Sequence, residues 1–241
     1  MRKRFALVED ILVVGTFDAV ASGLDHLMDM LRLCRGDNMG VRDLVPGLLL
    51  RLGRDQECYD FVKWWGTEGQ RGDYDWGDTD LPYLDVKDAD AFESPSYMCG
   101  SYLSLPGTVA TTLIKAKLLL DLQDLQKSSL LSNKLPQELV DNTKGFLPRT
   151  SIIAGERISW NPDDNTARIE ELNSQLDELY KAVKKYNPHF WPALMNPDRH
   201  LGGRPQMYSH GTKEEMQLVL GYCVASWKET PGALELIKAK A

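Results

Sequence analysis

The stretch LRLCRGDNMGVRDLVPGLLLRLGRDQECYDFVKWW, residues 31–65, decides the fold class of this chain. Apolar residues recur within it at helical spacing, and short groups of Gly, Asp, Asn and Arg interrupt them. Residues 36–40 (GDNMG) predict a tight turn, because Gly and Asn accept positive φ and Asp or Asn caps a following helix. The pattern is typical of helix, turn and helix, and it indicates an all-α fold.

The ends of the helices in this stretch carry local signals. Pro46 lies within the helical run 41–52, where it either kinks the helix or occupies its first turn. Gly53 is expected just beyond the end of that helix, and Asp55 is expected to cap the next one. In that next helix Trp64 and Trp65 are adjacent and cannot both face the core. One of them is therefore expected on the surface, where an exposed Trp is typical of protein interfaces.

Further helices are expected on both sides of this stretch. Thr212 and Glu215 match a capping box before an apolar stripe, which is the strongest helix signal in the chain. Irregular chain is expected over 146–165 and 188–203. Apolar stripes predict helices over 5–14, 18–34, 108–129, 137–144 and 166–186, with two more starting near Thr212 and Pro231.

Residues 67–104 interrupt the helical pattern with a segment rich in Gly, Asp and aromatic residues. Its large side chains are too numerous for a loose linker, so we expect an ordered irregular insertion that packs on the helices. The predicted organisation is one helical domain over 1–241, with N-terminal hairpins in 1–66 and further helices in 105–241. Short loops favour an antiparallel stack like the tetratricopeptide α-α superhelix, although no second copy recurs at a fixed period.

Composition narrows the class of partner. The net charge of −7 and the pI near 5.2 disfavour general nucleic-acid binding, which needs a basic surface. The four cysteines form no CxxC pair, and the N-terminal apolar run is interrupted by Glu9 and Asp10, so no signal peptide is expected. No apolar run approaches the ~20 residues of a membrane span. These features predict a cytoplasmic or nuclear protein with reduced cysteines.

Searches for catalytic motifs find no G-x-S-x-G elbow, no phosphate loop and no dinucleotide fingerprint. The acidic residues of the insertion are candidate oxygen ligands for a divalent cation, since such ions bind clustered carboxylates. The EF-hand spacing fails, however, because Gly77 and Leu84 stand where ligands belong. A solvated loop rich in local caps is the alternative interpretation, and no cofactor is then expected. The four candidate ligands are Asp73, Asp75, Asp78 and Asp80.

Histidines provide a second candidate for chemistry. His189, His200 and His210 lie on a loop-rich stretch without the spacing of a preset metal site. They either converge in space or remain isolated surface residues. If they converge, the chain is a small-molecule enzyme with a site between the acidic insertion and the 189–210 segment, acting with or without a divalent ion.

The charged residues of 31–65 indicate a different function. Arginines and carboxylates at helical spacing either form internal ion pairs or border a groove that binds a partner peptide. The second interpretation predicts a protein-interaction scaffold, and a homodimer is an alternative because a helical stack exposes apolar faces at its ends. The candidate peptide-binding residues are Arg51, Arg54, Asp60, Lys63 and Trp64.

Several blocks together resemble a group of largely fungal uncharacterised proteins, many of which carry a MYND-type zinc finger beside a helical region. These blocks are LMDMLRLCRGDNMGVRDLVPGLLLRLGRDQECYDFVKWW at 27–65, YDWGDTDLPYLDVKDADAFE at 74–93, KKYNPHFWPALMNP at 184–197 and YSHGTKEEMQLVLGYCVASWKETPGALELI at 208–237. The resemblance covers most of the chain and implies a tetratricopeptide-like module for protein interaction. The closely spaced Cys and His ligands of the finger are absent, so its zinc-dependent peptide binding is not expected here.

Overall fold

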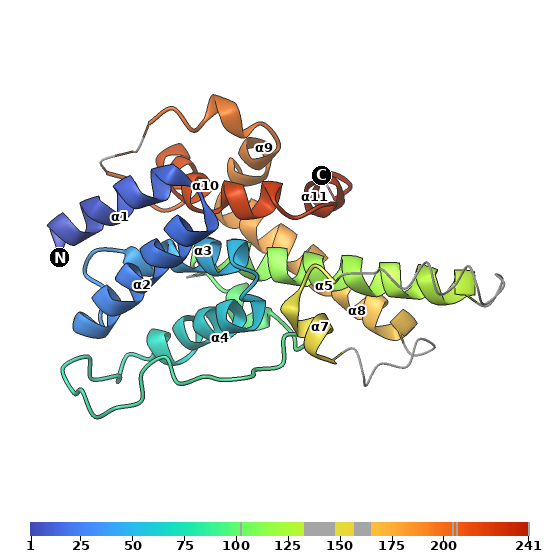
Figure 1. Ribbon diagram of the computed structural model, residues 1–241, viewed down its shortest axis with the longest axis horizontal. Coiled ribbons are helices and arrows are strands. Elements are labelled where there is room, and N and C mark those ends of the chain that lie inside the picture. Colours follow the sequence, from blue (N-terminus) through green and yellow to red (C-terminus); the bar gives the residue numbers. More distant parts are fainter. Residues whose placement is uncertain (102, 133–147, 157–164, 204, 206, 241) are drawn as a thin grey trace.

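The computed structural model describes residues 1–101, 103–132, 148–156, 165–203, 205 and 207–240. Within those ranges helices alternate with irregular connections and no strand occurs, which confirms the all-α prediction (Figure 1). The α-helices are α1 (Arg2–Val14), α2 (Phe17–Leu33), α3 (Val45–Arg51), α4 (Asp55–Gly66), α5 (Leu105–Ser132), α7 (Ser151–Glu156), α8 (Asn165–Tyr186), α9 (Phe190–Met195), α10 (Lys213–Lys228) and α11 (Ala233–Lys238). Short 3-10 turns are η1 (Val41–Asp43), η2 (Glu68–Gln70), η3 (Ser96–Met98) and η5 (Pro197–Arg199).

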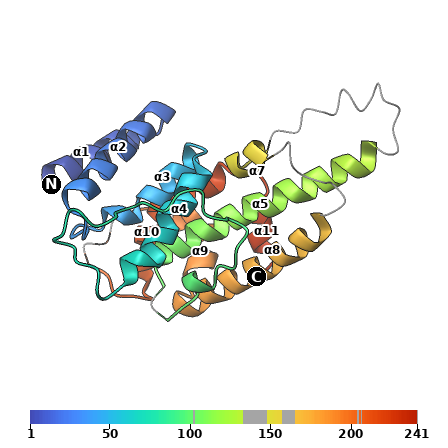
Figure 2. The ribbon, with the colours of Figure 1, turned by 90° about the horizontal axis from the view of Figure 1, so that it is seen from below.

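Helix α5 is the centre of the fold, as its broad apolar surface predicts. It contacts α3, α4, α7, α8, α10 and α11, and Figures 1 and 2 show α8 running alongside it. Leu113, Ile114 and Leu118 are fully buried, and burial of each such side chain stabilises the fold by roughly 1.5–3 kcal/mol. The other helices are therefore positioned by the side chains that they pack against α5.

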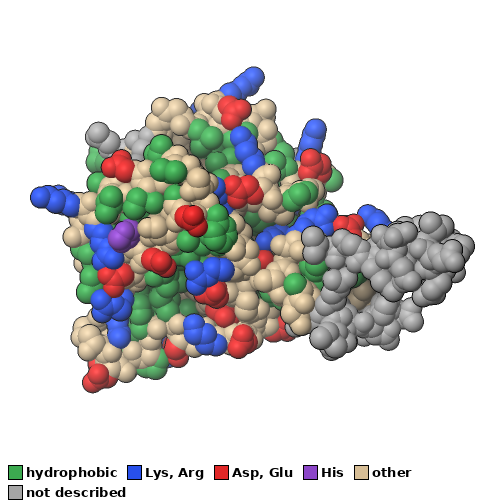
Figure 3. Space-filling model, viewed as in Figure 1, with side chains coloured by type: hydrophobic (Ala, Val, Ile, Leu, Met, Phe, Trp, Pro, Cys, Tyr) green, Lys and Arg blue, Asp and Glu red, His purple; other side chains and the backbone are tan. Residues whose placement is uncertain are grey.

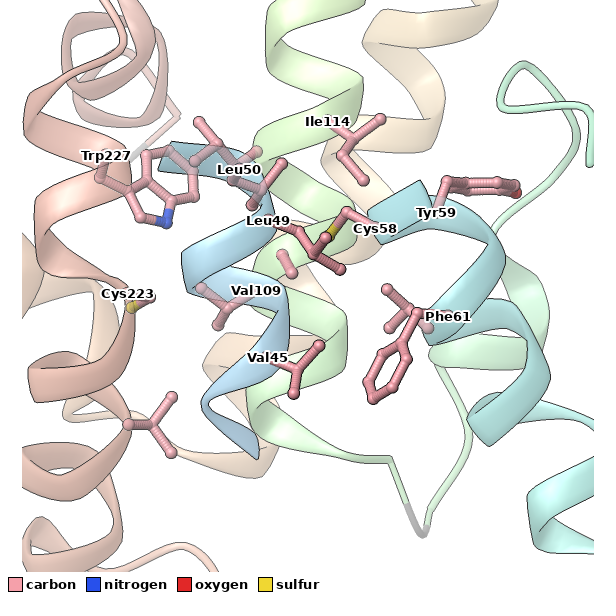
Figure 4. Packing of buried hydrophobic residues seen from close by; sticks show 14 of the residues in the cluster. Val45, Leu49, Leu50, Cys58, Tyr59, Phe61, Val109, Ile114, Cys223 and Trp227 are labelled. Carbon is pink, nitrogen blue, oxygen red and sulfur yellow. The ribbon is translucent and has the colours of Figure 1, made fainter. Parts of the chain in front are cut away.

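Helix α3 fills the space between α10 and α4, with α5 beside it (Figure 4). Pro46 stands in its first turn, which answers the question that the sequence left open. Gly53 has φ +69° and follows the last turn, where Arg54 N–H donates to the Leu49 carbonyl at 3.0 Å, so the predicted helix end is confirmed. A Cβ on Gly47 would stand 2.3 Å from the Tyr222 carbonyl oxygen, so this glycine allows the close approach of α3 and α10.

The α1–α2 hairpin forms one edge of the molecule (Figures 1 and 2). Helix α1 packs chiefly against α2, and α2 in turn packs against α3. The two helices join at Val13, Val14 and Phe17. These residues are 87%, 66% and 67% exposed, respectively. This edge is the apolar end that a stacked helical fold is expected to leave open.

The 67–104 segment is ordered and irregular, as predicted, with η2 and η3 as its helical turns. It runs along α4 in Figures 1 and 2. The Arg35 guanidinium donates to the carbonyl oxygens of Asp78, Thr79 and Leu81 at 2.7–3.2 Å, which fixes the outer part of the insertion to the end of α2. The segment therefore belongs to the packed structure.

Two sequence predictions about local structure are wrong. Asp55 does not cap α4 through its side chain, because Arg54 holds the cap position and Asp55 is fully buried at the first helical residue. It forms an ion pair with Lys117 of α5 and accepts the Ser151 N–H at 3.0 Å. The stretches expected to be irregular contain the six-residue helices α7 and α9. The helix expected over 137–144 lies outside the described residues.

The surface shows no segregation of charge on the face seen in Figure 1. Acidic and basic side chains alternate there, with hydrophobic side chains between them (Figure 3). Over the described part of the chain, every helix is too short or too polar to cross a bilayer.

Candidate functional site

The structure gives internal partners to the two arginines predicted to bind a peptide. Arg51 forms an ion pair with Glu229 at 2.9 Å and donates to the Gly15 carbonyl at 3.1 Å, so it ties α3 to the end of α10 and to the α1–α2 junction. Arg54 and Glu57 form an ion pair one turn apart at the start of α4. Both residues fit the internal ion-pair interpretation, and their role in peptide binding stays a prediction.

Asp60 and Lys63 hold the insertion against α4. Asp60 accepts hydrogen bonds from the backbone N–H groups of Asp88 and Ala89 at 3.0 and 2.9 Å. Lys63 pairs with Glu93 at 2.6 Å, and the same carboxylate accepts the Tyr59 hydroxyl at 2.8 Å. We call this contact between α4 and the 67–104 segment the insertion seam. Neither Asp60 nor Lys63 lines a cavity described below.

The expectation that one tryptophan of the Trp64–Trp65 pair is exposed is wrong. Trp64 is 0% and Trp65 7% exposed, because the insertion closes over the face of α4 that would otherwise meet solvent. The Trp64 indole donates to Asp85 at 3.1 Å and lies edge-on to Tyr74, Trp76 and Tyr83. Trp64 therefore anchors the seam.

Three of the four aspartates proposed as metal ligands bind neighbouring groups through their carboxylates. The pKa of Asp73 is lowered by hydrogen bonds from Arg71, and the two side chains are 2.9 Å apart. Asp75 accepts the Gly77 N–H, and Asp78 accepts the Asp80 N–H, each at 2.9 Å, as in Asx turns. Among the described residues no group of three or more His, Cys, Asp or Glu side chains is placed to hold a metal ion. The arrangement matches the cap-rich loop.

A row of hollows marks the end of the stack where α5 begins and where α4 and α8 end. The largest, which we call the Asp43 hollow, has a volume of about 410 Å³ and is bordered by Asp43 and Tyr208. Asp43 also borders a small hollow of about 30 Å³ that reaches Trp65. Trp65 then borders the Trp65 hollow, of about 250 Å³. Ser101 connects that hollow to the Tyr186 hollow, of about 310 Å³. Because neighbouring hollows share lining residues, we treat the row as one end groove.

Trp65 occupies the middle of the end groove. Its ring stacks on Trp76 with centroids 5.6 Å apart, and the Arg42 guanidinium lies 4.6 Å above it. The Trp65 Nε1–H is buried and finds no acceptor in the described part of the structure. A buried donor without an acceptor destabilises the fold. The nitrogen itself has almost no surface exposed to the groove. Ser104 and Gln70 supply further polar atoms beside it.

Among the described residues that line the groove, Asp43 supplies the carboxyl group. Its side chain is 22% exposed, and no described residue donates a hydrogen bond to it; the closest cation, Arg42 Nε, is 4.0 Å away. Burial raises the pKa of this carboxyl to about 6, the Asp37 and Glu215 carboxylates add to the increase, and Arg42 opposes it. A carboxyl perturbed in this way within a cavity is typical of a binding or catalytic site.

The Tyr186 hollow is bordered by the end of the insertion, but none of the described residues of 189–210, where the sequence predicts the other side of the alternative enzyme site, lines it. It is formed by the end of the insertion and the last turns of α8. The Tyr186 hydroxyl and His210 Nδ1 are 2.6 Å apart, and Glu215 accepts the Tyr186 hydroxyl at 3.2 Å. His189 and His200 do not join His210 in a metal-binding group within the described residues. Burial raises the pKa of Tyr186, and it raises the pKa of Cys99 to about 12.

Those pKa shifts bear on whether Tyr186 or Cys99 can act as a nucleophile or a general base. A nucleophile or general base needs a pKa near or below the working pH. Burial moves both Tyr186 and Cys99 in the opposite direction, so these groups stay protonated. Neither group is therefore an activated nucleophile or a general base in this structure.

Comparison with protein-family models, with curated proteins and with solved structures gives no match. The site therefore rests on its own geometry. Sequence reasoning did not single out Asp43 or Tyr208, because neither carries a motif. The available signals were indirect: Asp43 follows the 36–40 turn, and Tyr208 precedes the capping box that begins α10.

Proposed function

We propose that this chain is a helical scaffold that binds an extended peptide segment of a protein partner along the end groove. The observation that carries the proposal is the row of hollows that share lining residues. A peptide supplies a side chain or a carbonyl every ~3.3 Å, which suits a row of small hollows with polar atoms between them.

The end groove lies away from the residues that the sequence predicted to bind a peptide. Arg51, Arg54, Asp60, Lys63 and Trp64 stabilise the fold, and the groove runs past the far end of α4 and the start of α5. The two descriptions agree on the class of function and differ on the surface.

The finer parts of the proposal concern architecture and location. Antiparallel helices around α5 support a tetratricopeptide-like arrangement, and the resemblance to proteins that carry MYND fingers supports a role in protein interaction. The four cysteines are free in the structure, which is consistent with action in the cytoplasm or nucleus. No cofactor enters this proposal.

Blocking the groove tests the proposal. Ser101 is exposed and borders both the Trp65 and the Tyr186 hollow, so Ser101→Trp should fill the groove with little effect on stability. Ser22→Trp, at an exposed position of α2, is the matched control. Wild-type protein is used to select binders from a random linear-peptide library, and the affinities of the selected peptides for both variants are then measured by fluorescence anisotropy.

We expect Ser101→Trp to lose the selected peptides and Ser22→Trp to bind them as the wild type does. Selection of no peptide, or equal binding to both variants, would overturn the proposal. Thermal unfolding of each variant must match the wild type to within a few degrees, so that loss of binding is not loss of fold.

A small-molecule enzyme is the second candidate, and the Tyr186–His210–Glu215 network at the Tyr186 hollow is the observation that favours it. Thermal melting with EDTA and then with calcium, magnesium, manganese or zinc tests its metal-assisted form. An ion at ~100 times its dissociation constant adds about 2.7 kcal/mol and moves the midpoint by several degrees. A shift with one ion would favour the enzyme, and absence of any shift would count against its metal-assisted form.

A further inference from the structure

The walls of the Asp43 hollow combine a carboxylate with aromatic and apolar side chains. Asp43 lies at one side, and Tyr208, Tyr222 and Met39 also line the cavity. Tyr208 is 46% exposed, so its ring forms part of the open rim. Aromatic faces and a carboxylate attract the same kind of ligand, because the ring quadrupole and the negative charge both favour a cation.

The charges around the hollow have a negative balance. The carboxylates of Asp37, Asp43 and Glu215 and the cation of Arg42 all act on the same site, together with His210. Arg42 is the permanent cation of this set, and it approaches Asp37 and Asp43 no closer than 3.9 and 4.0 Å while its guanidinium rests on Trp65. Of the described residues, Asp43 is the charged one that lines the hollow, and the Asp37 and Glu215 carboxylates are buried near it. This part of the structure leaves the hollow complementary to positive charge.

The three carboxylates differ in how they are satisfied. Asp37 accepts the backbone N–H groups of Val41 and Arg42, each at 2.9 Å. Glu215 accepts the Asn187 amide at 3.1 Å and the Gly211 N–H at 2.7 Å. Asp43 accepts no hydrogen bond from the described residues, although less than a quarter of its side chain is exposed. Of the three, Asp43 is therefore the carboxylate with unused acceptor capacity.

We propose that the Asp43 hollow binds an alkylammonium group, the side chain of a lysine in the bound peptide, with the ammonium on Asp43 and the alkyl stem against Tyr208 and Met39. This inference rests on the proposed peptide-binding function. A cavity of about 410 Å³ accommodates the four-carbon stem, and the ammonium supplies the donors that Asp43 lacks.

Anions and guanidinium groups fit the hollow less well than an ammonium does. A phosphate or carboxylate would meet the Asp43 carboxylate, and no cationic side chain of the described residues lines the hollow to offset it. A guanidinium binds best to a carboxylate with both oxygens accessible in a plane, and Arg42 already stands beside Asp43. The compact ammonium needs no planar match, so lysine is preferred.

Small probes test this inference without a known partner. The probes are Nα-acetyl-lysine methylamide, its trimethylated form, the arginine analogue and the neutral norleucine analogue. NMR follows the Met39 methyl and the Tyr208 ring signals during each titration of the full chain. We expect the lysine probe to bind about tenfold more tightly than the norleucine probe, because a hydrogen-bonded charge pair is worth about one such factor.

Variants separate the pocket from general surface binding. Asp43→Asn should weaken the lysine probe about tenfold, and Tyr208→Ala, at an exposed position, should weaken it less. Asp80→Asn, an exposed aspartate on the insertion, is the matched control and should bind the probe as the wild type does. Equal binding of lysine and norleucine probes, or unchanged binding by Asp43→Asn, would overturn the inference. Tighter binding of the arginine probe would overturn the choice of ammonium.

The result can be told apart from a failure of peptide binding. If library peptides need an open groove at Ser101 but show no dependence on lysine or on Asp43, this inference fails and the proposed function stands. If the lysine probe binds through Asp43 while the library yields no peptide, the hollow stands and the peptide-binding proposal fails.

Discussion

The insertion seam and the end groove use carboxylates from the same 31–65 stretch in opposite ways. In the seam, Asp60 is 5% exposed and accepts two backbone N–H groups and the Gln56 amide at 2.9–3.0 Å. In the groove, the Asp43 side chain is 22% exposed, no described residue donates a hydrogen bond to it, and its pKa is raised to about 6. A carboxylate that accepts hydrogen bonds from the protein holds two segments of the chain together. A carboxylate without such donors destabilises the fold and can bind a ligand.

That contrast separates stability from function within one protein. Sites that bind ligands commonly retain groups that weaken the fold, since selection keeps what the ligand needs. If the comparison is correct, removing charge from the seam and from the groove must change the free energy of unfolding in opposite directions.

The largest effect is expected at Asp60. Asp60→Ala leaves the N–H groups of Asp88 and Ala89 without acceptors and should lower the free energy of unfolding by about 3–4 kcal/mol. Urea denaturation followed by tryptophan fluorescence measures it. Asp80→Ala, on the exposed surface of the insertion, should stay within about 0.5 kcal/mol of the wild type. A loss at Asp60 no larger than at Asp80 would break the comparison.

The next effect has the opposite sign. Asp43→Asn removes a carboxylate that is costly to bury in its ionised form, so it should raise the free energy of unfolding at pH 7.5 by about 1–3 kcal/mol, at roughly 1.4 kcal/mol per pKa unit. The folded state holds this proton with a pKa of about 6 and the unfolded chain near 3.8. The folded state thus binds more protons between these values, and the penalty is lost as pH falls from 6 to 4.

Urea denaturation of Asp43→Asn and wild type at several pH values checks both the size and the sign. The two proteins should converge near pH 4, and Asp80→Asn should track the wild type throughout. A variant less stable than the wild type at pH 7.5 would mean that Asp43 stabilises the fold.

A smaller effect is expected at the rim of the seam. Glu93 is 31% exposed and accepts the Lys63 ammonium and the Tyr59 hydroxyl. Glu93→Ala should lower the free energy of unfolding by about 1–2 kcal/mol, because both groups can be partly rehydrated. The same urea experiment, with Glu170→Ala at an exposed position of α8 as control, measures it. A loss equal to that of Asp60→Ala would show that position within the seam does not matter.

The smallest effect is expected at Arg54, whose pair with Glu57 spans one exposed turn of α4. Arg54→Ala should change the free energy of unfolding by about 0.3–0.5 kcal/mol. It should also leave the affinity of library-selected peptides unchanged, since Arg54 lies outside the end groove. Loss of peptide affinity in this variant would restore the surface that the sequence favoured.

Local rules predicted much of the fold from the sequence. Half of the capping box at Thr212 appears as predicted, with the Thr212 hydroxyl accepting the Glu215 N–H at 3.3 Å. The Glu215 carboxylate accepts the Gly211 N–H, whereas the Thr212 N–H donates to the Ser209 carbonyl. Gly53 ends α3 with φ +69°. Such features depend on neighbours within one or two turns. Pro46 was left undecided because the start of its helix depends on η1, which packs on α2.

The errors arise where distant segments meet. The sequence predicts that Asp55 caps a helix, but its partners Lys117 and Ser151 lie 62 and 96 residues away along the chain. The sequence predicts an exposed tryptophan in α4 because the sequence of that helix does not reveal that the insertion covers Trp64. The groove was missed for the same reason, since Asp43 and Tyr208 come together only when α10 packs on α3.

The most direct test of the account is a carbon-detected NMR titration of the Asp43 carboxyl, with and without Nα-acetyl-lysine methylamide. A carboxylate that is buried, unsatisfied and able to bind an ammonium should titrate with a pKa near 6 in the free protein. Its pKa should fall when the probe is present, since the probe's charge favours the ionised form. A pKa near 3.8 that the probe does not change would show that Asp43 is an ordinary surface carboxylate, and it would contradict the account.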